Sequence, residues 1–136
     1  MTLQRLQPEE LPRPQSYSQV VVSTGPRTVY VAGQVAVDAA GVVVAPGNLA
    51  GQALQAYRNV GRALEAAGAS AADVTKITTY VVGYSPAFLP DIAIGRRAVF
   101  GDSLPASTLV GVAQLAQPEL LIEVEAVAVL DEGGRE

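Results

Sequence analysis

Apolar and polar residues alternate along the first third of the chain in a way that predicts extended strands. Residues 16–24 (SYSQVVVST) are rich in β-branched residues and end at Gly25-Pro26, a dipeptide typical of turns. Residues 27–36 (RTVYVAGQVA) form a second run of this kind, and the short spacing between the runs predicts a hairpin. Residues 1–15 are polar and interrupted by three prolines, so we expect an arm with little regular structure.

Two segments carry the helical period of three to four residues. The clearer one covers residues 49–67 and ends at Gly68, which supplies a helix stop. Its apolar stripe consists of Leu54, Tyr57, Val60 and Leu64. A second helix is expected to open at Ser85-Pro86, as N-cap and first-turn proline, and to run to about Phe100.

Three further strands complete the predicted element order. They cover residues 75–83, 107–115 and 120–130, and residues 131–136 are expected to be a frayed tail. The order β-β-α-β-α-β-β, with hairpins at both ends, predicts an α+β fold. We expect a mixed or mainly antiparallel sheet with two helices on one face, forming a single domain over residues 1–136.

Several of these strands are apolar on both faces, notably at 20–22, 29–31 and 80–82. Two helices can cover only one face of such a sheet, and the chain holds no further helix for the other face. Only 16% of the residues are charged, against roughly 25% in an average soluble domain. Both observations predict that a partner subunit covers the second face, with any functional site at the subunit boundary.

The last strand places two carboxylates inside an apolar run. With an alternation of two, Glu123 and Glu125 share one face with Leu121, Val127 and Val129. One interpretation is that this end of the face is simply solvated. The other is that one of these carboxylates lines an interface cleft and positions water or a substrate amine.

Other candidates for chemistry are isolated residues. Gly33 lies inside a strand, which indicates a bulge, a close approach of a ligand or structural relief. Lys76 begins a strand, where a solvated end is favoured over a Schiff-base role, and Arg96-Arg97 lies on a helix, where a solvated face is favoured. Two carboxylates belong to turns: Asp38 and Asp73.

Composition excludes several classes of function. The chain has no Cys and no His, which removes thiol and imidazole catalysis, disulfides and the usual zinc ligands. No glycine-rich phosphate loop or metal-ligand cluster is present, so we expect no metal and no cofactor. Proton transfer must then use Asp, Glu, Tyr, Lys76 or ordered water.

Charge and hydropathy constrain the partners. The net charge is −4 and the nine basic residues are scattered, which argues against nucleic acid as a partner. No apolar run is long enough to span a bilayer, and residues 1–7 lack a signal-peptide pattern. We therefore expect a cytoplasmic protein that contacts no membrane.

Four short segments, in order, carry a family resemblance: Tyr17-Ser18-Gln19, Ala32-Gly33-Gln34, Leu104-Pro105-Ala106 and the run from Ile122 to Val129. Over about residues 16–130 the chain resembles the YjgF/RidA family, also called the reactive intermediate deaminase or L-PSP endoribonuclease family. The resemblance implies a chorismate-mutase-like fold and a homotrimer with three clefts between subunits.

The resemblance also implies an activity, the hydrolysis of small enamines and imines such as 2-aminoacrylate to a keto acid and ammonia. The family's cleft tyrosine matches Tyr17, its glycine after the second strand matches Gly33, and its water-positioning glutamate matches Glu123. The arginine that binds the substrate carboxylate in those deaminases is Ser107 here, which indicates an arginine-lacking branch. Two other family residues, a serine and an asparagine, correspond to Ala32 and Ala93.

Three functions follow from these observations. The first is a hydrolase or deaminase for a small metabolite, in which Glu123 orders water while Tyr17 and Ser107 shape the cleft. The second is a binding protein whose clefts hold a small molecule without turnover. The third, a ribonuclease, is disfavoured by the lack of His and of a basic groove. Arg96 or Arg97, on the preceding helix, could replace the missing charge at Ser107.

Overall fold

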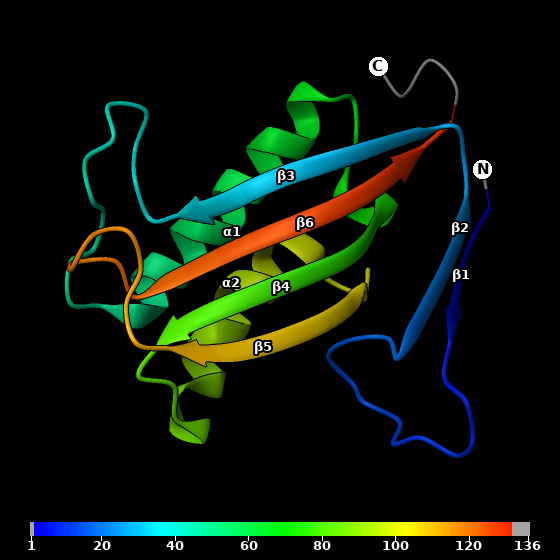
Figure 1. The fold of residues 1–136 in the computed structure, drawn as a ribbon, viewed down its shortest axis with the longest axis horizontal. Helices are drawn as coiled ribbons and strands as arrows, with labels where there is room; N and C mark the ends of the chain where they lie inside the picture. The colour runs from blue at the N-terminus through cyan, green and yellow to red at the C-terminus, as the bar shows by residue number, and fades with distance from the viewer. Residues whose placement is uncertain (1, 132–136) are drawn as a thin grey trace.

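A computed structural model describes residues 2–131 of the chain (Figure 1). The predicted frayed tail therefore lies, beyond Asp131, outside the described residues. Two 3-10 turns, Ala71–Asp73 and Pro86–Phe88, precede β4 and α2. The strands and helices are β1 (Thr2–Leu6), β2 (Val20–Thr24), β3 (Arg27–Val35), α1 (Leu49–Ala66), β4 (Val74–Val82), α2 (Leu89–Phe100), β5 (Ala106–Val112) and β6 (Ile122–Leu130).

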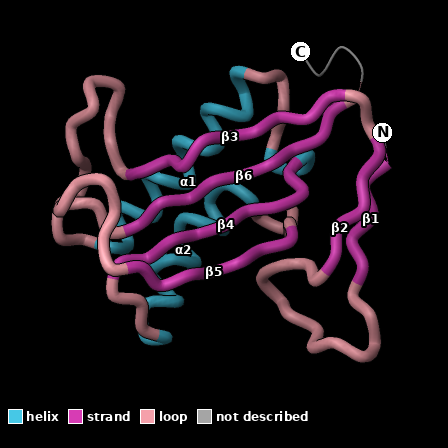
Figure 2. Tube along the Cα trace, in the orientation of Figure 1, coloured by secondary structure: helices cyan, strands magenta, loops and turns pink. Residues whose placement is uncertain are grey.

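The main sheet is mixed and has the strand order β3-β6-β4-β5 (Figure 2). Strand β6 is antiparallel to both of its neighbours, whereas β4 and β5 are parallel. Both helices lie on the same face of this sheet, behind the strands in Figure 1. The prediction of an α+β fold with two helices on one face of a mixed sheet is confirmed.

The predicted terminal hairpins are wrong. Strand β2 pairs with β1, not with β3, so part of the segment that we expected to be an irregular arm is a strand. At Gly25 the chain passes so close to β6 that an added Cβ would lie 2.6 Å from the Leu130 carbonyl oxygen. The chain turns there, and β1 and β2 form a separate ribbon beyond the end of the main sheet (Figure 1).

The second expected hairpin, between β5 and β6, is absent for a different reason. Helix α2 connects β4 to β5, and a helical crossover of this kind joins parallel neighbours. Strand β6 lies instead between β3 and β4. Its alternate residues are buried along the whole strand, as suits a central position.

The core lies between the helices and one face of the sheet. Ile122, Val124 and Ala126 of β6 pack there with the buried stripe of α1, as the alternation of the last strand predicted. No helix among residues 2–131 covers the opposite face, which we call the open face. It presents Tyr30, Tyr80, Glu123, Glu125, Val127 and Val129.

A close contact between the two helices gives a first test of this packing. A Cβ added to Gly95 of α2 would lie 2.7 Å from the Ala53 carbonyl oxygen of α1, so the backbones would have to separate. We expect Gly95→Ala to lower the free energy of unfolding by about 1–3 kcal/mol, measured by urea denaturation. Gly61→Ala is the matched control, because its Cβ would meet only the Val99 side chain at 3.5 Å. Equal stability of Gly95→Ala and wild type would contradict the close packing.

Candidate functional site

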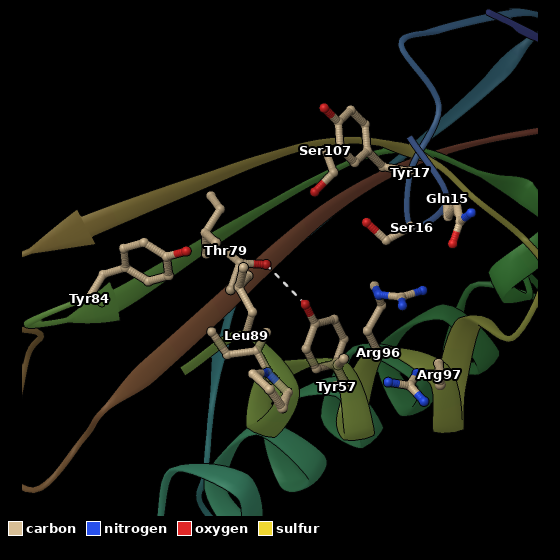
Figure 3. A pocket seen from close by; sticks show the side chains of 14 residues that line it. Gln15, Ser16, Tyr17, Tyr57, Thr79, Tyr84, Leu89, Arg96, Arg97 and Ser107 are labelled. Atoms are coloured by element: carbon tan, nitrogen blue, oxygen red, sulfur yellow. Dashed lines mark hydrogen bonds between the residues drawn. The ribbon is translucent and has the colours of Figure 1, made fainter. Parts of the chain in front are cut away.

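A pocket of about 930 Å³ opens between α2 and the edge strand β5 (Figure 3). We call it the α2–β5 pocket. Its walls come from residues 15–17, from α2, and from Ser107 and Leu109 of β5, and Tyr57 and Thr79 lie at its floor. Four of the predicted site residues line it: Tyr17, Arg96, Arg97 and Ser107.

Hydrogen bonds from the backbone and the side chain of Ser18 bring Tyr17 to this pocket. The Ser18 N–H donates to the Pro105 carbonyl oxygen at 3.0 Å, and its hydroxyl donates to the Leu104 carbonyl oxygen at 2.5 Å. Ser18 also forms a parallel bridge with Ala106. The segments that resembled family motifs at residues 17–19 and 104–106 are thus held against each other.

Ser107 lies on the helix side of the sheet. It is in register with Ile77 of β4, whose side chain is fully buried beneath the helices. Its hydroxyl therefore faces the helix layer rather than the open face. Figure 3 shows Ser107 and Tyr17 on the strand side of the pocket and Arg96 on the α2 side.

Arg96 brings a half-buried positive charge into the pocket. Burial lowers the pKa of its guanidinium, as does the nearby Arg97 cation, whereas Tyr57 raises it. An arginine nevertheless keeps its charge in a protein. Within residues 2–131 no carboxylate lies within 4.0 Å of this guanidinium. Among the described residues of the single chain, Arg96 therefore has no counter-ion, and Arg97 beside it is more exposed.

The floor of the pocket is a polar pair that the sequence analysis missed. The hydroxyls of Tyr57 and Thr79 are 3.1 Å apart, and both residues are buried. Burial raises the pKa of Tyr57, while the hydrogen bond to Thr79 and the charge of Arg96 lower it. A tyrosine on a buried helical stripe needs a hydrogen-bond partner for its hydroxyl. Thr79 shares a face with the inward-facing residues Ile77 and Val81, so its position in the sequence could have predicted it as that partner.

The other two predicted site residues, Glu123 and Gly33, lie together on the open face. A Cβ added to Gly33 would overlap the Glu123 carboxylate and would lie 2.7 Å from its Cδ. The β3–β6 register also shifts between Val31 and Gln34. Gly33 therefore combines a bulge with a close approach, and the approaching group is a carboxylate of the same chain. The neighbouring carboxylate of Glu125 accepts a hydrogen bond from the Tyr80 hydroxyl at 2.5 Å.

These two groups of residues cannot meet within one chain. Glu123 is in register with Tyr80 of β4, and Ser107 is in register with Ile77 of the same strand. Tyr80 and Ile77 are three residues apart. Strands β6 and β5 are two positions apart in the sheet, which separates the residues by about 10 Å across and about 10 Å along the strands. The sheet itself also lies between them, because they face opposite sides.

Comparison with known proteins identifies the family. The family model described as endoribonuclease L-PSP matches residues 9–130. The chain belongs to the YjgF/RidA family. It is 34% identical over 114 residues to the rat 2-iminobutanoate/2-iminopropanoate deaminase, covering 84% of this chain and 80% of that protein. It is 33% identical over 124 residues to a RutC family protein of Pyrococcus horikoshii, covering 88% and 92%.

Solved structures of YjgF/RidA proteins share the fold. The Rid family protein YyfB of Yersinia pestis is 40% identical, covers 96% of this chain and 100% of its own, and superposes with a TM-score of 0.89. The YjgF gene product of E. coli is 32% identical, with a TM-score of 0.65 and coverage of 83% and 87%. The resemblance inferred from four short segments is thereby confirmed.

The remaining candidate residues of this YjgF/RidA chain have local roles. Lys76 donates to the Thr108 hydroxyl at 2.6 Å. The Asp38 carboxylate accepts from the backbone N–H groups of Ala40 and Val42, as predicted for a turn residue. Ala93 lines the pocket.

In the described part of the chain, no group of three acidic, His or Cys side chains could hold a metal ion, and no helix could span a membrane.

Proposed function

We propose that this YjgF/RidA protein hydrolyses small imine or enamine metabolites at clefts between the subunits of a homotrimer. The observation that carries the proposal is the split of the candidate site between two faces of one sheet. Tyr17 and Ser107 face the α2–β5 pocket, whereas Glu123 and Gly33 lie on the open face. A neighbouring copy whose open face covered the pocket would unite the two groups. The names of the rat and other mammalian relatives support an imine as the substrate.

The proposed reaction needs only water and a carboxylate. An enamine first tautomerises to its imine. Water then adds to the C=N carbon while Glu123 accepts a proton from it, which gives a carbinolamine. The nitrogen takes up that proton, which completes the neutral carbinolamine. A second proton then passes from the hydroxyl group to the nitrogen as the C–N bond breaks, so that ammonia leaves and the carbon keeps the oxygen as a carbonyl. The balance is one imine and one water to one carbonyl compound and one ammonia, so no cofactor or metal is required.

The pocket residues would bind and orient the substrate. The hydroxyls of Tyr17 and Ser107 offer hydrogen bonds at the β5 edge, and Arg96 and Arg97 offer positive charge from α2. A serine hydroxyl makes one neutral hydrogen bond where an arginine would bind a carboxylate through two charge-assisted ones. In this proposal the charge that the family supplies after Pro105-Ala106 comes from the helix instead.

The direct test is ammonia release from imines that an amino-acid oxidase generates in the assay. We expect the wild-type protein to accelerate release and Glu123→Gln to lower kcat about 100-fold or more, since the amide cannot accept the proton from water. Weak activity is expected for the imine of 2-aminoacrylate. Ser107→Arg should raise that activity, because it restores a bidentate contact to the carboxylate.

Equal rates of wild type and Glu123→Gln on every imine would contradict the hydrolase proposal. A second candidate function, a trimer that binds a metabolite without turnover, is favoured by the serine at position 107. It predicts no acceleration by wild type and saturable binding of the corresponding keto acids in calorimetry. Activity that appears only in Ser107→Arg would support this second function.

A further inference from the structure

The two carboxylates of β6 turn toward opposite neighbouring strands. Glu123 and Glu125 lie two residues apart on the open face, which separates their Cβ atoms by about 7 Å. The Glu123 carboxylate lies over Gly33 of β3, where the absence of a side chain leaves room for it. The Glu125 carboxylate instead accepts its hydrogen bond from the Tyr80 hydroxyl of β4 at 2.5 Å. Two groups that side-chain rotation alone would bring together are thus kept apart.

The register of β4 and β6 places Tyr80 for this contact. Tyr80 is directly opposite Glu123, and side chains in such positions have Cβ atoms about 4.5–5.5 Å apart. Its hydroxyl nevertheless reaches diagonally to Glu125, which is opposite Thr78. The pKa of Tyr80 is raised, first by this hydrogen bond and then by burial and by the charges of the two glutamates. Tyr80 therefore keeps its proton at neutral pH and acts as the donor.

No other group in the described part of the chain holds Glu125. Lys76, the single lysine of the chain, lies on the same face opposite Val127, but it donates to the Thr108 hydroxyl of β5. Within residues 2–131 the Tyr80 hydroxyl is thus the one hydrogen-bond or ion-pair partner of Glu125. The direction in which Glu125 points therefore depends on a single hydroxyl of its own chain.

From these contacts we propose that Tyr80 is a positioning residue, which holds Glu125 toward β4 so that Glu123 alone acts on the water. The inference rests on the proposed function, because it takes Glu123 as the proton acceptor of the hydrolase. Without the hydroxyl, the Glu125 carboxylate is free to turn toward Glu123 and to compete for the same water. Like charges would then repel each other, and water shared between two acceptors would lose its fixed position.

The proposed assembly leaves this argument unchanged. The hydrogen bond joins two strands of one chain, so it is present on whichever copy supplies Glu123 to the cleft. A neighbouring copy that covers the open face also removes solvent from both carboxylates. Removal of water strengthens the electrostatic interactions between such groups, so that control of the direction of Glu125 matters more in the assembly than in the single chain.

Kinetics of ammonia release by the assembled full-length chain test the role of the hydroxyl. Tyr80→Phe keeps the ring, and we expect kcat to fall about tenfold or more with KM within about twofold, since substrate binding is unaffected. Tyr30→Phe is the matched control. It removes a hydroxyl from the same face that has no partner within residues 2–131, and it should leave kcat unchanged.

Rescue by a second substitution tests whether Tyr80 acts through Glu125. Glu125→Ala removes the carboxylate that Tyr80→Phe releases, so Glu125→Ala alone and the double variant should both keep kcat within about threefold of wild type. A merely structural role of Tyr80 predicts no such recovery. A double variant no faster than Tyr80→Phe would overturn the inference, as would a wild-type kcat for Tyr80→Phe. A tenfold loss in Glu125→Ala alone would also overturn it, because Glu125 would then act directly.

Light scattering of each variant checks the assembly. We expect Tyr80→Phe to have the mass of the wild-type protein. If Tyr80→Phe dissociates, the hydroxyl holds the subunits together rather than the carboxylate, and the inference is overturned.

A crystal structure of Tyr80→Phe separates this inference from the proposed function. We expect the Glu125 carboxylate to leave its place beside β4 and to lie nearer Glu123. If it moves in this way while wild type hydrolyses no imine, the positioning of Glu125 by Tyr80 stands and the hydrolase proposal fails. If wild type hydrolyses imines and Glu125 keeps its place in the variant, the hydrolase proposal stands and the inference fails. Movement of Glu125 together with a lowered kcat supports both.

Discussion

Val127→Asp is expected to convert the proposed homotrimer into monomers. Val127 lies on the open face, in register with Tyr30, whose side chain is 80% exposed in the single chain. If a neighbouring copy covers this face, the substitution buries an unpaired carboxylate, which costs several kcal/mol. Light scattering coupled to size exclusion should give three times 14.0 kDa for wild type and about 14.0 kDa for the variant.

Two controls accompany this measurement. Val42→Asp makes the same change at a residue that is 60% exposed in the loop between β3 and α1, and it should leave the trimer intact. Glu123→Ala removes a charge from the open face and should also leave the trimer intact. A wild-type protein that is monomeric at micromolar concentration would refute the proposal that a neighbouring copy covers the open face. A Glu123→Ala variant that dissociates would show that Glu123 holds the assembly together rather than acting in catalysis.

Gly33→Ala is expected to slow hydrolysis strongly while leaving the fold and the assembly unchanged. The new Cβ would occupy the space of the Glu123 carboxylate, which is the end of a flexible side chain and can move aside. The displaced carboxylate would no longer hold water in the proposed position, and a misplacement of about 1 Å can cost 100-fold in rate. We expect kcat to fall about 100-fold or more in the ammonia-release assay, with unfolding unchanged within about 1 kcal/mol.

A double-mutant cycle separates displacement of Glu123 from other effects of the alanine. Gly33→Ala combined with Glu123→Gln should be no slower than Glu123→Gln alone, because both changes remove the same function. If the kcat of the double variant instead falls by the product of the two single losses, Gly33 acts through some group other than Glu123. A Gly33→Ala variant as active as wild type would contradict the catalytic role of Glu123 itself.

The sequence predicted which residues of the last strand share a face, because successive side chains of any β-strand point to opposite sides of the sheet. Ile122 and Val124 pack into the core and Glu123 and Val127 lie opposite, as a period of two requires. The predicted stripe of α1 is confirmed at three of its four residues, since Tyr57, Val60 and Leu64 are buried, whereas Leu54 is only half-buried. Local periodicity decides which side a residue faces, and it predicted this much of the core and of the open face.

Strand partners and the contents of the pocket could not be predicted in the same way. Nothing in the run at 16–24 indicates that it pairs with residues 2–6 rather than with β3. The approach of Tyr17 to Ser107 depends on hydrogen bonds from Ser18 to the loop before β5, far away in the sequence. The position of Arg96 across the pocket depends on how α2 packs on α1. Such contacts depend on tertiary packing, and the periodicity of apolar residues in the sequence does not predict them.

The central place of β6 has a consequence for synthesis of the chain. Strand β6 follows the other described strands in the sequence and is made after them. It lies between β3 and β4, so β3 and β4 do not pair with each other. Chains are made from the N-terminus at about 5–20 residues per second. Until residues 122–130 have emerged, β3 and the β4-α2-β5 unit remain separate pieces with uncovered edges, and such edges invite pairing with other chains. A nascent chain stalled before Ile122 should therefore be the form of this protein most dependent on chaperones.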